Sequence, residues 1–102
     1  LLISTAPVDQ AERIGNVLLE ERLVACVNYV GPVKSRYWWQ GALEEAAETI
    51  LLMKTTDQLA ARAIGRLRAV HPYQVPEAVT VDLAGGLPPY LEWIAQVPAQ
   101  QR

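Results

Sequence analysis

Apolar residues recur along this chain at two spacings, and the change from one to the other marks the ends of the predicted elements. A spacing of three and four residues, typical of amphipathic helices, occurs after Asp9, in residues 57–71 and again in residues 88–97. Asp9 is a candidate cap for the first helix, with Glu12 as its capping-box partner. Pro98 is expected to end the last helix.

Four apolar segments lack the helical spacing and are predicted to be strands: residues 1–4, 25–39, 49–54 and 78–83. Thr5-Ala6-Pro7 is expected to end the first strand, and residues 40–47 are expected to connect the second strand to the third. Residues 25–39 are interpreted as one long strand interrupted at Gly31-Pro32. That pair is alternatively a turn between two strands, since Gly and Pro mark bulges, edges and turns.

The predicted order is therefore βαββαβ with a C-terminal helix. Two helical crossovers that frame a hairpin form a split βαβ unit, so we expect a ferredoxin-like α+β fold with its helices on one face of an antiparallel sheet. At 102 residues the chain forms a single domain, residues 1–102. The hairpin is long for this sheet, and its unpaired backbone together with 51% hydrophobic residues predicts association with further copies.

Composition argues against several classes of partner. The net charge of −2 provides no basic surface for nucleic acid or for an acidic membrane. No apolar run approaches the roughly 20 residues that span a bilayer. Cys26 is the only cysteine, which rules out an intrachain disulfide and favours a reducing compartment, so a cytoplasmic location is predicted.

The most specific motif is residues 71–77, His-Pro-Tyr-Gln-Val-Pro-Glu, which follows the second predicted helix. Its two prolines stiffen the connection, whereas a flexible linker would be richer in Gly and Ser. This segment is therefore expected to present its polar and aromatic side chains in a fixed arrangement.

Six stretches, in order, resemble the CutA divalent-cation tolerance family. They are Thr5-Ala6-Pro7, residues 21–28, residues 35–41, Glu48 with residues 51–55, residues 71–77 and residues 90–93. The resemblance implies a compact homotrimer with a ferredoxin-like fold, a link to copper and other divalent cations, and no catalysed reaction. Some members carry a cysteine and a second histidine where this chain has Ser4 and Val70.

His71 is the candidate metal ligand, with copper as the candidate metal. Copper and zinc sites usually need three or four Cys or His ligands, and one chain offers only Cys26 and His71. Metal binding is therefore expected to be weak and to depend on His71, helped by carboxylates or by symmetry copies of His71, and no cofactor is obligatory. Two alternatives for His71 remain open: a charge at the helix C-terminus and a residue of a ligand cleft.

Five residues are predicted to line such a cleft: Tyr37, Trp39, Lys54, Tyr73 and Glu77. Alternation along a strand places Tyr37 and Trp39 on one face and Trp38 on the other. These aromatics suit an interface between subunits or a surface on which a planar molecule stacks. Lys54 ends one strand and Glu77 begins another, and these ends can approach each other, so an ion pair between them is predicted, either on the surface or beside the cleft. Glu48 and Asp82 are further polar candidates.

The sequence thus predicts a non-catalytic homotrimeric protein of divalent-cation, especially copper, tolerance. The alternative is a trimeric small-molecule sensor or scaffold of the PII type. The short connection with Glu44 and Glu45 argues against a nucleotide ligand. An enzyme would need a carboxylate held beside His71 as an acid and base pair, and no catalytic residue is assigned.

Overall fold

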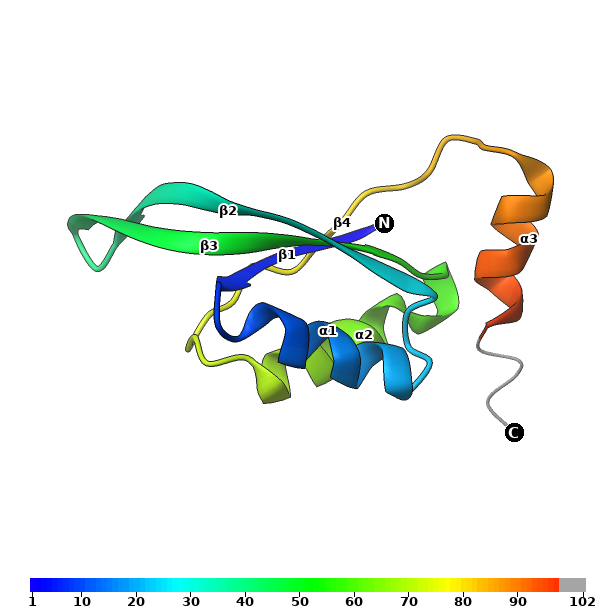
Figure 1. The fold of residues 1–102 in the computed structure, drawn as a ribbon, viewed down its shortest axis with the longest axis horizontal. Helices are drawn as coiled ribbons and strands as arrows, with labels where there is room; N and C mark the ends of the chain where they lie inside the picture. The colour runs from blue at the N-terminus through cyan, green and yellow to red at the C-terminus, as the bar shows by residue number, and fades with distance from the viewer. Residues whose placement is uncertain (98–102) are drawn as a thin grey trace.

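The computed structural model describes residues 1–97, so the predicted helix stop at Pro98 lies outside the described residues. Its elements are β1 (Leu2–Pro7), α1 (Ala11–Glu20), β2 (Cys26–Trp39), β3 (Ala42–Lys54), α2 (Asp57–Val70), β4 (Val79–Thr80) and α3 (Pro88–Gln96). Helices α1 and α2 lie side by side on one face of the sheet, and α3 stands at one end of the molecule (Figure 1). None of the described helices is long and apolar enough to cross a membrane.

The sheet has the order β2-β3-β1-β4, and all neighbouring strands are antiparallel. This order with βαββαβ connectivity is the predicted split βαβ arrangement, which confirms the antiparallel α+β fold. Strand β1 continues through Pro7, which lies opposite Glu48, so the expected break at Thr5 is wrong. The strand continues because Ala6 pairs with β3 and buries its side chain completely.

Helix α1 begins without the predicted capping box. Its N-cap residue is Gln10, which makes no side-chain capping bond, so the assignment of Asp9 is wrong. The Gln10 amide donates to the Pro7 carbonyl at 2.9 Å and closes a turn directly after β1. The chain is therefore still turning at Asp9, and the helix starts at Ala11.

Strand β2 is one long strand with an irregularity, as predicted, and the alternative of two strands joined by a turn is wrong. Its pairing with β3 shifts between Val30 and Val33, around a cis Gly31–Pro32 peptide. Gly31 has a φ of 152°, and a Cβ there would lie 3.0 Å from the Glu48 carbonyl oxygen. The bulge therefore requires glycine at this position.

Strand β3 begins at Ala42, not near Thr49, so the predicted connection over residues 40–47 is wrong. The turn is only Gln40 and Gly41, whose φ values of 50° and 81° are both positive, as in a type I′ hairpin turn. Residues 42–47 are mostly exposed because this part of β3 extends beyond β1 and covers no core (Figure 1). Glu44, Glu45 and three alanines give this exposed part of the strand neither the alternation nor the run of large apolar residues that marks a buried strand.

Strand β4 is shorter than the predicted 78–83 and includes only Val79 and Thr80. Pairing continues for one more residue, since the Val81 amide donates to the Leu1 carbonyl at 2.8 Å. Helix α3 packs loosely on the rest of the chain, because Ile94 is its one buried residue.

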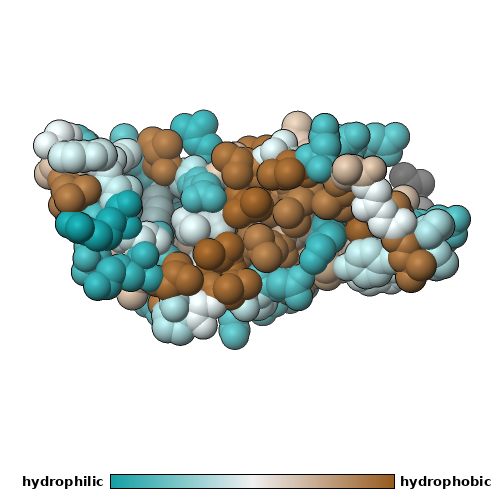
Figure 2. Space-filling model, turned by 90° about the horizontal axis from the view of Figure 1, so that it is seen from above, coloured by the Kyte–Doolittle hydropathy of each residue, from teal (hydrophilic) through white to brown (hydrophobic). Residues whose placement is uncertain are grey.

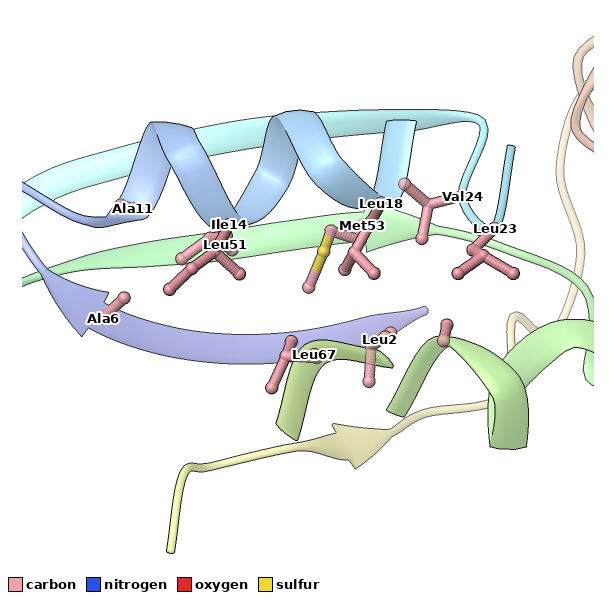
Figure 3. Close-up of a cluster of buried hydrophobic side chains, with 11 residues drawn as sticks. Leu2, Ala6, Ala11, Ile14, Leu18, Leu23, Val24, Leu51, Met53 and Leu67 are labelled. Atoms are coloured by element: carbon pink, nitrogen blue, oxygen red, sulfur yellow. The ribbon is translucent and has the colours of Figure 1, made fainter. Parts of the chain in front are cut away.

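The core lies between the sheet and helices α1 and α2, as the buried side chains in Figure 3 show. The largest completely buried hydrophobic residues are Leu2, Ile14, Leu18, Leu51, Met53 and Leu67. Gly15 lies directly under the ring of Tyr29, and a Cβ on Gly15 would overlap its hydroxyl group. The close approach of the Tyr29 ring therefore requires a residue without a Cβ at position 15.

The sheet face opposite α1 and α2 carries a broad apolar surface (Figure 2). Large hydrophobic side chains that are at least partly exposed in this single chain, away from α1 and α2, include Val30, Val79, Val81, Leu83, Leu87, Tyr90 and Trp93. An exposed apolar surface of this extent is typical of a protein that associates with a partner.

Candidate ligand cleft

A cleft of about 660 Å³ lies between the extended β2–β3 hairpin and the segment that follows α2. Its lining is Thr5, Ser35, Arg36, Tyr37, Trp39, Glu48, Pro72, Tyr73, Gln74, Val75 and Glu77. In Figure 1 that segment runs from the helical layer back to the sheet and passes beside the end of β1. The β2–β3 hairpin extends beyond the sheet at the same end. The predicted stiff heptapeptide thus forms one wall of the cleft, and the overhang of the hairpin forms the other.

Glu48 and Tyr73 join the two walls. Glu48 is only 3% exposed, and its Oε2 accepts a hydrogen bond from the Tyr73 hydroxyl at 2.7 Å. Burial raises the pKa of Tyr73 above its usual value of 10, and the hydrogen bond to Glu48 and the charge of Glu48 raise that pKa further. The phenol is therefore neutral and donates to a carboxylate inside the cleft.

His71 holds the start of the cleft wall in place. The ring is 8% exposed, and its Nε2–H donates to the Thr5 carbonyl at 2.8 Å, while Nδ1 accepts from the Tyr73 amide at 3.1 Å. This pair of neighbours requires a neutral ring with its proton on Nε2. A metal on His71 would have to replace one of these bonds, so the assignment of His71 as a metal ligand stays a prediction.

The structure brings four of the five predicted cleft residues together: Tyr37, Trp39, Tyr73 and Glu77. Trp38 points elsewhere and is 74% exposed, which confirms the predicted alternation of the three aromatics along β2.

Lys54 does not line the cleft. Its ammonium group donates to Asn28 Oδ1 at 2.8 Å at the far end of β3, six positions and thus roughly 20 Å from Glu48. Within residues 1–97 no ion pair joins Lys54 to Glu77, so that predicted pair is wrong. The prediction failed because β4 is short and Glu77 precedes it in the wall segment, at the opposite end of the sheet from Lys54.

Sequence reasoning named Glu48 as a polar candidate without placing it in the cleft, and it missed Ser35, Arg36 and Gln74. A signal for Glu48 is its position directly before the apolar segment 49–53, where the buried part of the strand begins. Arg36 lies at the rim, where its Nε is 3.5 Å from Glu45 Oε1 and both side chains are more than half exposed. Such an exposed pair contributes about 0–1 kcal/mol.

The described residues contain no group of three or more His, Cys, Asp or Glu side chains that could hold a metal ion. Cys26 is half-buried, its Sγ lies 3.8 Å from the Tyr90 hydroxyl, and neither Cys26 nor His71 lines the cleft. One chain therefore does not assemble a Cys and His metal site in residues 1–97.

Residues 1–97 match the CutA1 divalent ion tolerance protein family. The divalent-cation tolerance protein CutA of Thermus thermophilus is 42% identical over 96 residues, which cover 94% of this chain and 93% of that protein. The crystal structure of CutA from Xylella fastidiosa superposes with a TM-score of 0.90 at 45% identity, covering 94% of this chain and 93% of that one. A structure described as the PII-like protein CutA from Nostoc sp. in apo form gives a TM-score of 0.86 at 36% identity, covering 91% of this chain and 90% of that one.

The fold and the matched residues place this chain in a class of small α+β proteins of divalent-cation tolerance. The chain belongs to the CutA1 divalent ion tolerance family. It spans 65% of the Danio rerio relative and 49% of the Mus musculus relative. The names of two relatives include a compartment, periplasmic for Archaeoglobus fulgidus and chloroplastic for Oryza sativa.

Proposed function

We propose that this chain acts as a homotrimeric protein of divalent-cation tolerance, with copper as the principal metal and the cleft as its ligand site. The observation that carries this proposal is the match of residues 1–97 to the family, together with a formed cleft at the family-like heptapeptide. We propose the cytoplasm as its location, in keeping with the single cysteine.

Assembly is supported by the parts of the sheet that one chain leaves without a partner. The hairpin extends past β1, and β4 pairs over only two residues at the other edge. Apolar side chains are exposed over the uncovered sheet face (Figure 2). Pairing of these edges and faces between copies would bury both the backbone and the apolar surface.

A copper role through direct binding would depend on His71. Each chain supplies one imidazole whose two nitrogens already have partners at 2.8 and 3.1 Å. Direct binding at His71 is therefore weak in this proposal, and the tolerance function works through the state of the cleft or through copies of His71 in the assembly.

The second candidate function is a small-molecule sensor, favoured by the similarity to the PII-like CutA of Nostoc sp.. A two-residue hairpin turn replaces any long mobile loop, and Glu44 and Glu45 follow it in β3. This arrangement disfavours a phosphate-bearing nucleotide at the hairpin tip.

Sedimentation equilibrium at low micromolar concentration tests the assembly, with a trimer of three 11.3 kDa chains expected. Growth of cells that lack their own CutA protein, with and without this chain at raised copper, tests the tolerance function. A monomer at 11.3 kDa, or growth that this chain does not improve, would contradict the corresponding part of the proposal.

A further inference from the structure

Glu48 places a carboxylate inside the cleft, and only one of its two oxygens accepts a hydrogen bond from the described residues. Its Oε2 accepts from Tyr73, but within residues 1–97 no group donates to Oε1 and no cationic side chain pairs with the carboxylate. Every fully buried side-chain oxygen or nitrogen among the described residues has a hydrogen-bond partner. Because Oε1 has no partner, it is not fully buried, and Glu48 exposes it to the cleft that it lines. A carboxylate withdrawn from water is costly unless a cation or several donors compensate for it.

Aromatic side chains lie next to this carboxylate on the same side of the hairpin. Glu48 is paired with Val33, Tyr37 with Glu44 and Trp39 with Ala42, and residues directly opposite on paired strands share a face. Alternate residues of β2 also share a face, so both rings lie on the side of Glu48. Tyr37 and Trp39 are 38% and 39% exposed and line the cleft, so their rings are available to a ligand.

The charges that line the cleft sum to a negative value. Glu48 and Glu77 are the carboxylates, and Arg36 is the one cation of the lining. The guanidinium of Arg36 lies at the rim and is already paired with Glu45. An entering group therefore meets an aromatic wall and a negative charge that nothing in the described chain neutralises.

We propose that the cleft binds a small organic cation, a protonated amine or amidine on a planar or apolar body. Its N–H groups donate to Glu48 Oε1, and its body packs against Tyr37 and Trp39, whose rings attract cations. This inference rests on the proposed function, in which the cleft is the ligand site, and it specifies the chemistry of the ligand.

Other ligand classes fit this lining less well. Phosphates and carboxylates are repelled by Glu48 and Glu77. A hard divalent cation needs about six oxygen ligands, and the described part of the chain gathers no group of three metal-binding side chains. An organic cation requires only one enclosed carboxylate and an aromatic wall, which are the features present.

Three matched probes test the proposal on the whole chain: benzamidine as the cation, benzamide as its neutral counterpart and benzoate as the anion. Binding is followed by nuclear magnetic resonance through the indole N–H signal of Trp39. We expect benzamidine to bind at least tenfold more tightly than benzamide, because one of its hydrogen bonds is charge-assisted. Benzoate is expected to cause no shift.

Two variants assign the effect to Glu48. Glu48→Gln should lower the affinity for benzamidine about tenfold and leave the affinity for benzamide unchanged. Glu92→Gln is the control, since Glu92 lies exposed on α3 and its replacement changes the net charge equally. This control should leave the affinities for benzamidine and benzamide unchanged. Equal binding of benzamidine and benzamide, or equal loss in both variants, would overturn the proposal.

Sedimentation of the same samples separates this inference from the proposed function. A trimer that does not distinguish the probes retains the proposed assembly and refutes the cationic ligand. If Glu48→Gln abolishes assembly and the wild type binds no benzamidine, a basic side chain of a neighbouring copy occupies the cleft, and the free organic cation is refuted. Binding by a monomer would support the inference and contradict the trimer.

Discussion

Replacing Tyr73 by Phe tests whether the Tyr73–Glu48 bond holds the two walls of the cleft together. The change removes one hydroxyl and leaves the ring, which packs 4.8 Å from the His71 ring, in place. A hydrogen bond to a charged group contributes about 1.5–3 kcal/mol. Because Glu48 is 3% exposed and Tyr73 is less buried, we expect the free energy of unfolding to fall by about 2 kcal/mol at pH 7.

A double-mutant cycle with Glu48→Gln isolates this bond. A glutamine oxygen still accepts from the hydroxyl, but as a neutral group, so Tyr73→Phe should cost only about 1 kcal/mol in that background. Tyr37→Phe is the matched control, since that hydroxyl forms no hydrogen bond in the described residues, and it should change stability by less than about 0.5 kcal/mol.

The pH dependence gives an independent check. Since the pKa of Tyr73 is raised above its unfolded value of 10, the contribution of Tyr73 is fully present below pH 10 and is lost as pH rises through the folded pKa. One pH unit above the unfolded pKa, at pH 11, the difference between wild type and Tyr73→Phe should shrink by about 1.4 kcal/mol. The pKa values of Tyr29 and Tyr90 are also raised, but both proteins carry these residues, so their effect cancels.

Urea denaturation followed by circular dichroism at pH 7, 9 and 11 measures these differences. A loss below about 0.5 kcal/mol at pH 7 would show that the bond contributes little. A difference that is the same at pH 7 and pH 11 would refute the raised pKa of Tyr73 as the origin of its contribution.

Three further predictions concern other parts of the molecule. Gly15→Ala should destabilise the chain by about 1–2 kcal/mol, because the added Cβ overlaps the Tyr29 ring and this outweighs the higher helix propensity of Ala. In a Tyr29→Ala background the same change should stabilise the chain by about 1 kcal/mol, as measured by urea denaturation. Equal effects in both backgrounds would show that the ring does not pack against Gly15. Calorimetric titration with copper(II) should show weak binding that His71→Ala removes, and unchanged binding would place the site elsewhere. Cys26 should react with a thiol reagent slowly in the native protein and several-fold faster after Tyr90→Ala, and equal rates would show that α3 does not shield the thiol.

Local sequence patterns are sufficient to predict the order of elements and to identify the family-like motifs. Apolar spacing is a local property that survives in any window of the chain, so α2 was placed to within one residue, at Asp57–Val70. The alternation of Tyr37 and Trp39 against Trp38 follows from strand geometry alone. The two prolines of the heptapeptide 71–77 predict a segment that presents side chains, and Tyr73 and Glu77 line the cleft.

Tertiary structure decided which side chains meet, because that depends on register and on strand length. Pro7 opposite Glu48 sets where β1 ends and the overhang begins, and no local pattern encodes this pairing. The same register carries Lys54 to the far end of β3 and brings Glu48 under Tyr73, which lies 25 positions along the chain from it. Long-range pairing fixes these distances, so the cleft and its enclosed carboxylate became visible only in the folded chain.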